Sequence, residues 1–85
     1  MKTKYNLVLS VEALKQAKDL DKPVRDRIFK ELPFLESHPM SGKLLTGDLR
    51  GALSFRVGKY RVIYRLSECK IIVVTILHRK KVYDL

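Results

Sequence analysis

Several residue types are scarce in this chain, and each scarcity narrows what the protein can be. A single cysteine, Cys69, excludes an internal disulfide and a zinc site built from several cysteines. No apolar stretch approaches the roughly 20 residues needed to cross a bilayer, and the apolar part of the N-terminus is too short for a signal peptide. The two histidines stand forty positions apart without a carboxylate cluster, so we expect no metal site and no cofactor. Together these absences predict a cytoplasmic protein without a membrane partner.

Acidic residues are also few: nine Asp and Glu stand against eighteen Lys and Arg, for a formal net charge of +9. Residues 40–85 hold ten basic and three acidic residues, whereas residues 1–39 hold eight and six. Cations held close together repel one another unless an anion neutralises them. The second half therefore predicts a polyanion or an acidic protein as partner, with a basic surface that serves only solubility as the alternative.

The first half of the chain predicts a short strand and two helices. With 85 residues the chain has material for one core, so we expect a single domain over residues 1–85. A strand over Thr3 to Leu9 is followed by Ser10 as an N-cap, and Leu14 and Ala17 are expected to share a buried face. A second helix is expected after Asp21 as N-cap, with Pro23 in its first turn.

An apolar stripe runs along that second helix at spacings of four, four and three residues: Val24, Ile28, Leu32 and Leu35. Pro33 interrupts the stripe. Its ring removes a hydrogen bond and disfavours helical dihedrals at Leu32, so a kink or an early stop is predicted there.

The second half reads as strands. The segment "GALSFRVGKYRVIYRL" splits at Gly58 into two alternating runs, which predicts a hairpin. After a turn at "SECK", the run "IIVVTIL" is apolar at every position but one, as in a central strand. The expected fold class is α+β: two N-terminal helices packed on one face of a small, mainly antiparallel four-stranded sheet, in the order β-α-α-β-β-β.

The alternation also predicts a cationic face on the side without helices. The two tyrosines of the hairpin fall on the apolar side, and Arg56 and Arg61 fall on the other. A count in steps of two from Val73 through Thr75 and Leu77 adds Arg79 to this face. Guanidinium groups stay charged and bind phosphate oxygens bidentately, so this face has the composition of a phosphate-binding site.

Three motifs in this half give the chain a family resemblance: "LRG" before the hairpin, "YRVIY" in its second strand, and "HRKKVY" after the last strand. With them the chain resembles the RelE/ParE superfamily of toxins from toxin–antitoxin pairs, and specifically its RelE branch. The resemblance implies a metal-free endoribonuclease that cleaves messenger RNA on the ribosome, by attack of a ribose 2′-OH on the adjacent phosphate. It also implies an acidic, RelB-like antitoxin with which the toxin forms a hetero-oligomer.

The same resemblance implies the site residues. The strand arginine of the family falls on Arg61, its basic residue after the last strand on Arg79 with His78 beside it, and its C-terminal tyrosine on Tyr83. Such a tyrosine stacks on a splayed base or orients the 2′-OH. Five further cationic residues are expected to bind RNA: Arg56, Lys59, Arg65, Lys80 and Lys81.

The general base stays open at this stage. Many RelE toxins have lysines in the strand before "YRVIY", whereas this chain has Arg56 there, and arginine does not deprotonate in proteins. His78, Lys59 and a group whose pKa the RNA itself shifts are the candidates. Two other function classes also stay open: a ParE-like protein that poisons DNA gyrase, and an RNA-binding module without catalysis.

Overall fold

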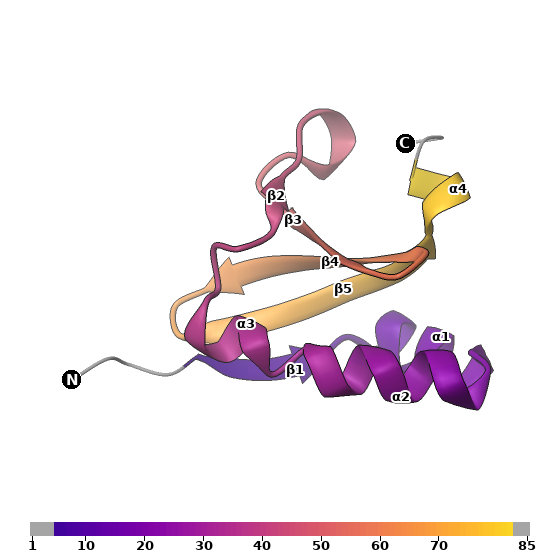
Figure 1. Cartoon of the computed structure of the whole chain (residues 1–85). Helices are drawn as coiled ribbons and strands as arrows, with labels where there is room; N and C mark the ends of the chain where they lie inside the picture. The colour runs from indigo at the N-terminus through magenta and orange to yellow at the C-terminus, as the bar shows by residue number, and fades with distance from the viewer. Residues whose placement is uncertain (1–4, 83–85) are drawn as a thin grey trace.

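The computed structural model describes residues 5–82, which form one sheet and one layer of helices (Figure 1). The elements follow in the order β1 (Asn6–Leu9), α1 (Val11–Asp19), α2 (Lys22–Glu31), α3 (Phe34–Ser37), β2 (Lys43–Leu44), the 3₁₀ turn η1 (Gly47–Leu49), β3 (Leu53–Val57), β4 (Tyr60–Ser67), β5 (Lys70–His78) and α4 (Arg79–Val82). The strands lie in the order β1-β5-β4-β3-β2; β1 runs parallel to β5, and all other neighbours are antiparallel. The predicted α+β class is confirmed.

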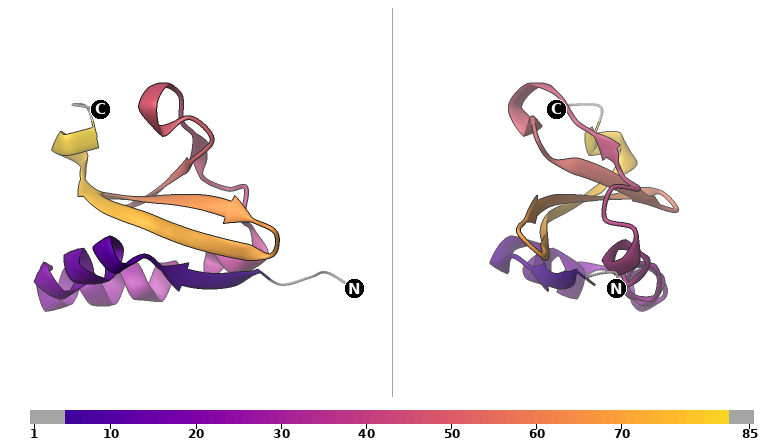
Figure 2. Two further views of the ribbon diagram at one scale, coloured as in Figure 1. Left: turned by 180° about the vertical axis from the view of Figure 1, so that it is seen from behind. Right: turned by 90° about the vertical axis from the view of Figure 1, so that its left-hand side faces the viewer.

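Helices α1, α2 and α3 lie against one face of the sheet, whereas the η1 loop and α4 rise on the other side (Figures 1 and 2). The core fills the space between the helical layer and the sheet. Its buried members are Ala13, Ala17, Ile28, Leu32, Leu35, Leu53, Val57, Val62, Tyr64, Ile71, Val73 and Ile76. No helix within residues 5–82 has the length and apolar character needed to cross a membrane.

Helix α1 begins at the predicted cap but buries a different face. The Ala13 N–H donates to Ser10 Oγ at 3.0 Å. Ala13 and Ala17 are buried, whereas Leu14 is 47% exposed, so the prediction that Leu14 shares the buried face is wrong. The reason lies in how closely α1 approaches β5: the Gln16 side-chain oxygen accepts from the Ile76 N–H at 2.7 Å, and small side chains suit such an approach.

The second helix is interrupted where Pro33 predicts an interruption: α2 ends at Glu31 and α3 starts at Phe34. Asp21 does occupy the N-cap position of α2, although its side chain makes no capping hydrogen bond. The expected departure of Leu32 from helical dihedrals is wrong, because Leu32 keeps φ −57° and ψ −37°. Its N–H still donates to the Ile28 carbonyl at 2.9 Å, and its side chain is held in the core.

The sheet contains a β-bulge that the alternation count does not foresee. Ile63 pairs with Thr75 and Tyr64 with Val73, so Val74 is the extra residue of β5. Before the bulge, Ile71 and Val73 face the helices; after it, Ile76 does. The prediction that Val73 lies on the uncovered face is therefore wrong, whereas Thr75 and Leu77 do face the same side as Ile63 and Arg61.

The sheet has five strands where four were expected. The additional strand β2 is two residues long and pairs with β3 (Lys43 with Ser54, Leu44 with Leu53), so it is too short to show an alternating pattern. The first strand begins at Asn6, and the predicted start at Thr3 lies outside the described residues.

A buried tyrosine ties the segment before β2 to the core. The Tyr64 hydroxyl donates to the Pro39 carbonyl at 2.7 Å and accepts from the Gly42 N–H at 3.0 Å. A Cβ atom at position 42 would lie 2.6 Å from that hydroxyl oxygen, so the contact requires glycine. Burial raises the pKa of Tyr64.

Candidate nucleic-acid interface

Two arginines face each other across the hairpin. Arg56 on β3 and Arg61 on β4 are direct cross-strand partners. Both alternate with core residues such as Val57 and Val62, so their side chains lie on the face that α1 to α3 leave uncovered. Like charges directly opposite each other destabilise a strand pair, and an anion between them reverses the sign of that effect. We call this side of β4 and β3, carrying Arg56, Arg61 and Arg65, the arginine face.

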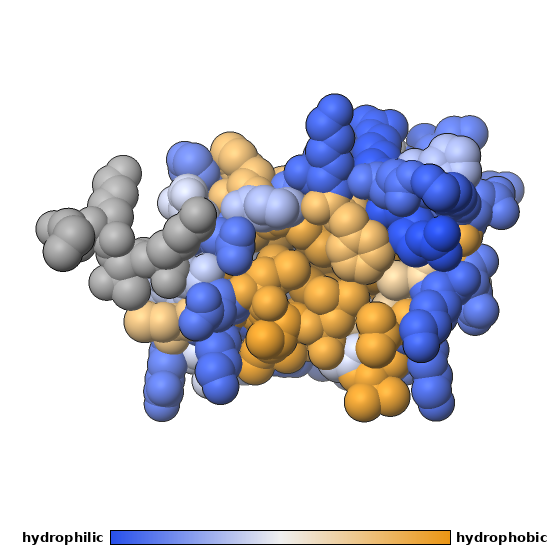
Figure 3. All heavy atoms as spheres, turned by 90° about the horizontal axis from the view of Figure 1, so that it is seen from below, coloured by the Kyte–Doolittle hydropathy of each residue, from blue (hydrophilic) through white to orange (hydrophobic). Residues whose placement is uncertain are grey.

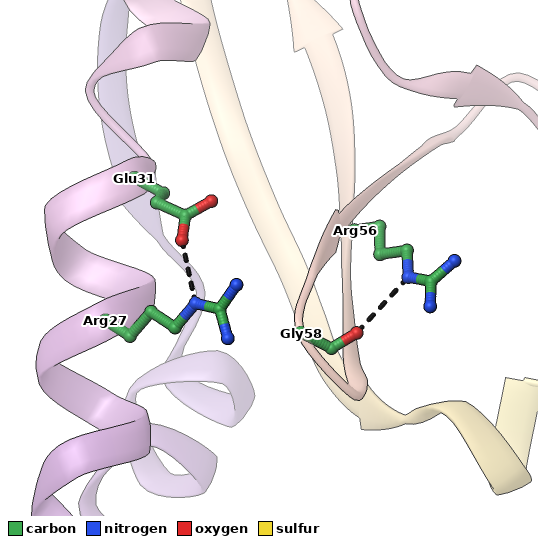
Figure 4. A network of polar contacts seen from close by, with 4 residues as sticks. All are labelled: Arg27, Glu31, Arg56 and Gly58. Atoms are coloured by element: carbon green, nitrogen blue, oxygen red, sulfur yellow. Dashed lines mark hydrogen bonds and ion pairs between the residues drawn. The ribbon is translucent and has the colours of Figure 1, made fainter.

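The polar contacts of the arginine face differ from those of the helical layer. On α2, Arg27 Nε lies 3.0 Å from Glu31 Oε2 and Lys22 Nζ 2.8 Å from Asp26 Oδ2. Arg56 Nε instead donates to the Gly58 carbonyl at 3.2 Å, which leaves its two terminal nitrogens for another acceptor (Figure 4). Within residues 5–82, no carboxylate pairs with an arginine of the arginine face.

The end of β5 brings a second group of cations to the same end of the sheet. The Arg79 N–H donates to the Lys59 carbonyl at 2.7 Å, so the pairing of β5 with β4 continues up to the hairpin turn. α4 begins at Arg79 and rises on the side away from α1 and α2 (Figure 1). Arg79 and Lys80 are both exposed there.

His78 lies on the other side of the sheet from Arg61. It pairs with Tyr60, and the two rings meet edge to face with centroids 5.2 Å apart. Tyr60 packs against the core on the helix side, and cross-strand partners project to the same face. The Lys80 N–H donates to His78 Nδ1 at 3.3 Å, so the neutral ring carries its proton on Nε2.

Lys59 also stands apart from the arginine face. It is exposed in the hairpin turn, beside Gly58 with φ +60°. Together they border a pocket of about 230 Å³ that opens between the hairpin and α2. Its lining residues are Val24, Arg27, Val57, Gly58, Lys59 and Tyr60.

A loop around η1 borders the arginine face. It is closed by a bond from the Leu45 N–H to the Ala52 carbonyl at 2.9 Å, and it rises above β2 and β3 (Figure 1). Arg65 Nη1 donates to the Arg50 carbonyl in this loop at 3.1 Å. Ile63 and Ser54, partners on the same side of the sheet, are 0% and 4% exposed, and the Ser54 hydroxyl has no hydrogen-bond partner among the described residues.

The structure thus places Arg56, Arg61 and Arg65 on one face of the sheet, with Arg79 near the hairpin end, and separates them from His78 and Lys59. Tyr83 and the Lys81 side chain lie outside the described residues. The sequence analysis did not select Arg50 as a site residue. Its position in the "LRG" motif is the one signal that could have found it. Residues 5–82 contain no group of three His, Cys, Asp or Glu side chains that could hold a metal ion.

These features define a small basic α+β domain with opposed cations on an uncovered sheet face. A family profile described as the ParE toxin of the type II toxin–antitoxin system, parDE, matches residues 7–83. The chain therefore belongs to the ParE toxin family of type II toxin–antitoxin systems, and the expected RelE/ParE superfamily is confirmed.

Solved structures of related toxins share the fold. The RelBE2 toxin–antitoxin complex from Mycobacterium tuberculosis contains a chain that is 26% identical, with 89% of this chain and 99% of that chain covered at a TM-score of 0.78. The isolated RelE toxin from E. coli is 23% identical, with 94% and 92% covered at a TM-score of 0.73. The archaeal RelE–RelB complex from Pyrococcus horikoshii gives 21% identity, 89% and 96% coverage and a TM-score of 0.71. A search of curated protein sequences gave no significant match.

Proposed function

We propose that this toxin acts as RelE toxins do: it is a metal-free endoribonuclease that cleaves messenger RNA on the ribosome by attack of a ribose 2′-OH on the adjacent phosphate. The observation that carries the proposal is the direct opposition of Arg56 and Arg61 on the uncovered face. Such a pair suits a phosphodiester, which gains negative charge on its phosphoryl oxygens as the 2′-OH attacks.

Each residue of the site takes a stated role. Arg61 contacts the phosphoryl oxygens, Arg79 adds a second cation from the end of β5, and Tyr83 stacks on a base or orients the 2′-OH. The remaining cations attract the RNA and the ribosome and contact phosphates. They are Arg56, Lys59, Arg65, Lys80 and Lys81.

Three groups are candidates for the proton transfer. His78 and Lys59 lie on the helix side of the hairpin end, so either can serve only if the RNA reaches around that end. The third candidate is a group whose pKa the RNA shifts. The pH dependence of the cleavage rate in His78→Gln discriminates, because loss of the His78 limb identifies that imidazole as the titrating group.

The partner in this proposal is an acidic, RelB-like antitoxin, bound in a hetero-oligomer. The net charge of +9 favours an acidic protein. Figure 3 shows the helical side, where apolar side chains gather and hydrophilic ones surround them. Exposed apolar residues of α1 and α2 include Val11, Leu14 and Phe29, and an apolar area rimmed by polar residues is typical of a protein-binding surface.

The deciding experiment is single-turnover cleavage of messenger RNA on programmed ribosomes, with analysis of the product ends. Attack by the 2′-OH breaks the bond to the 5′ oxygen, so the downstream product begins with a 5′-OH and the upstream product ends in a 2′,3′-cyclic phosphate or in the 2′- or 3′-phosphate that its hydrolysis gives. Cleavage should also survive excess chelator when polyamines maintain the ribosomes. Products that end uniformly in 3′-OH, or no cleavage at all, would overturn the proposal. Tyr83→Ala should slow the reaction and leave antitoxin binding intact.

The match to the ParE profile favours one alternative, a toxin that binds and poisons DNA gyrase. A gyrase supercoiling assay with the same purified protein tests it. Inhibition of supercoiling without ribosomal cleavage would select this alternative, and the arginine face would then bind an acidic protein surface or DNA.

A further inference from the structure

We infer that Arg65 is a positioning residue for the η1 loop, and that the loop presents Arg50 as a further phosphate-binding residue beside the arginine face. This inference rests on the proposed binding of RNA to that face. It assigns a role to the "LRG" motif, to which the proposed catalytic residues do not belong. It also makes positioning of the loop, in place of direct RNA binding, the main role of Arg65.

The contact between the two residues supports the first part. Arg65 Nη1 donates to the Arg50 carbonyl, not to a carboxylate, so the contact fixes the backbone of the loop. Gly51, the next residue, has φ +90°, and a Cβ atom there would lie 3.3 Å from Arg65 Nη1. The chain therefore passes close to the guanidinium with a backbone conformation that favours glycine.

The same hydrogen bond gives the Arg50 carbonyl a donor from the sheet, in a loop whose other hydrogen bonds are local. Its own bonds are short-range: Arg50 N–H donates to the Gly47 carbonyl and Ala52 N–H to the Leu49 carbonyl, with Leu45 N–H to the Ala52 carbonyl closing it. Residues 46–51 are otherwise exposed or half-buried. A charge-assisted bond from the sheet is therefore the contact that ties the loop tip to β4.

The position of the loop supports the second part. Arg65 lies four residues from Arg61 along β4, about 13 Å at roughly 3.3 Å per residue. An RNA strand that places one phosphate at Arg61 and runs along β4 reaches Arg65 and the loop with a neighbouring phosphate. Arg50 is exposed at that end, so its guanidinium is free to meet solvent or ligand. Its motif neighbours Leu49 and Gly51 build the turn that holds it there.

The test measures binding of a fluorescent single-stranded RNA oligonucleotide over a range of salt concentrations. Arg50→Ala should weaken binding roughly fivefold and lower the salt slope by about 0.7, the value for one phosphate on a single strand. Arg65→Ala should weaken binding by a similar factor, and the double variant should be no worse than either single variant. Arg65→Lys keeps the charge but not the reach, so it should behave as Arg65→Ala does. Arg27→Ala, which removes one charge from α2, is the matched control and should leave binding unchanged.

Hydrogen exchange gives a readout that does not depend on RNA. The amides of Leu45 and Ala52 should exchange faster in Arg65→Ala than in the parent, and should keep the parent rate in Arg50→Ala. Full binding by Arg65→Lys, additive losses in the double variant, or unchanged exchange in Arg65→Ala would overturn the inference, as would a parent protein that binds no RNA. A parent that binds RNA but does not cut on ribosomes would overturn only the proposed function.

Discussion

Alternate residues of β4 lie in different environments: one set packs against the helices, and the other lies on the arginine face. Tyr60, Val62 and Tyr64 face the helices, where close packing and a satisfied hydroxyl hold Tyr64 in place. Arg61 and Arg65 face the other way, where a like charge lies opposite Arg61. The helix side therefore gains free energy from burial, whereas the arginine side loses some through repulsion until an anion arrives. One strand thus carries stability on one set of positions and the proposed function on the other.

The largest expected effect comes from the arginine side. Arg61→Ala should lower the single-turnover cleavage rate roughly a hundredfold, on the order of 3 kcal/mol, because the lost contact strengthens as the phosphoryl group gains charge. The melting temperature should stay the same or rise slightly, because repulsion from Arg56 is relieved. Arg27→Ala removes an equal charge from α2 and should cleave at the parent rate. Cleavage by Arg61→Ala at the parent rate would show that the arginine face does not carry the proposed function.

The next effect belongs to the helix side. Gly42→Ala forces a Cβ atom to within 2.6 Å of the Tyr64 hydroxyl oxygen, so the loop or the ring must shift. We expect a loss of about 2 kcal/mol in the free energy of unfolding, measured in urea, with unchanged cleavage per folded molecule. Gly42 does not have a positive φ, so the loss is due to this close contact and not to backbone strain. An unchanged free energy of unfolding in Gly42→Ala would show that the contact with Tyr64 is not tight.

Removing the hydroxyl itself should cost less. Tyr64→Phe leaves the Gly42 N–H and the Pro39 carbonyl without this partner, at about 1–2 kcal/mol. Burial raises the pKa of Tyr64 above its ordinary value of 10.0, so the folded state holds this proton more tightly than the unfolded state. The resulting stability is present below pH 10 and is lost as the pH rises toward the folded pKa. Urea titrations across this range should therefore show a steeper alkaline loss in the parent than in Tyr64→Phe.

The smallest effect is expected at the exposed start of α4. Lys80→Ala should slow association with ribosomes severalfold at low salt, through lost electrostatic steering, and the difference should vanish as salt is raised. The measurement is the association rate by stopped flow at several salt concentrations. A defect that persists at high salt would instead mark Lys80 as a direct contact in the bound complex.

The sequence predicted the parts of the fold that depend on local pattern. The cap at Ser10, the break at Pro33 and the hairpin at Gly58 each follow from the chemistry of one residue, and all three occur. The predicted placement of Arg56 and Arg61 on one face is also found. Their direct opposition was not predicted and follows from the register that the two-residue loop sets.

What the sequence missed depends on contacts between distant segments. Leu14 is exposed because Gln16 brings α1 against β5, and the position of Val73 depends on an extra residue opposite Ile63 and Tyr64. His78 was expected beside Arg79 at one site, but its register with Tyr60 sends it to the helix side. The contact between Arg65 and the Arg50 carbonyl joins positions fifteen residues apart, and no periodic pattern in the sequence predicts it.

The bulge at Val74 changes which residues of β5 face the helices. Ser10 holds the bulge from outside the strand, with its N–H on the Val73 carbonyl and its hydroxyl on the Val74 carbonyl at 2.9 and 2.8 Å. Odd-numbered residues face the helices before the bulge, and even-numbered residues do so after it. Deleting Val74 would remove the bulge: Thr75 would then follow Val73 in regular alternation, so Ile76 would still face the helices and Leu77 the other side. Among homologous toxins, a one-residue deletion in this strand should therefore fall at the bulge, because a deletion away from it would turn inward-facing residues outward.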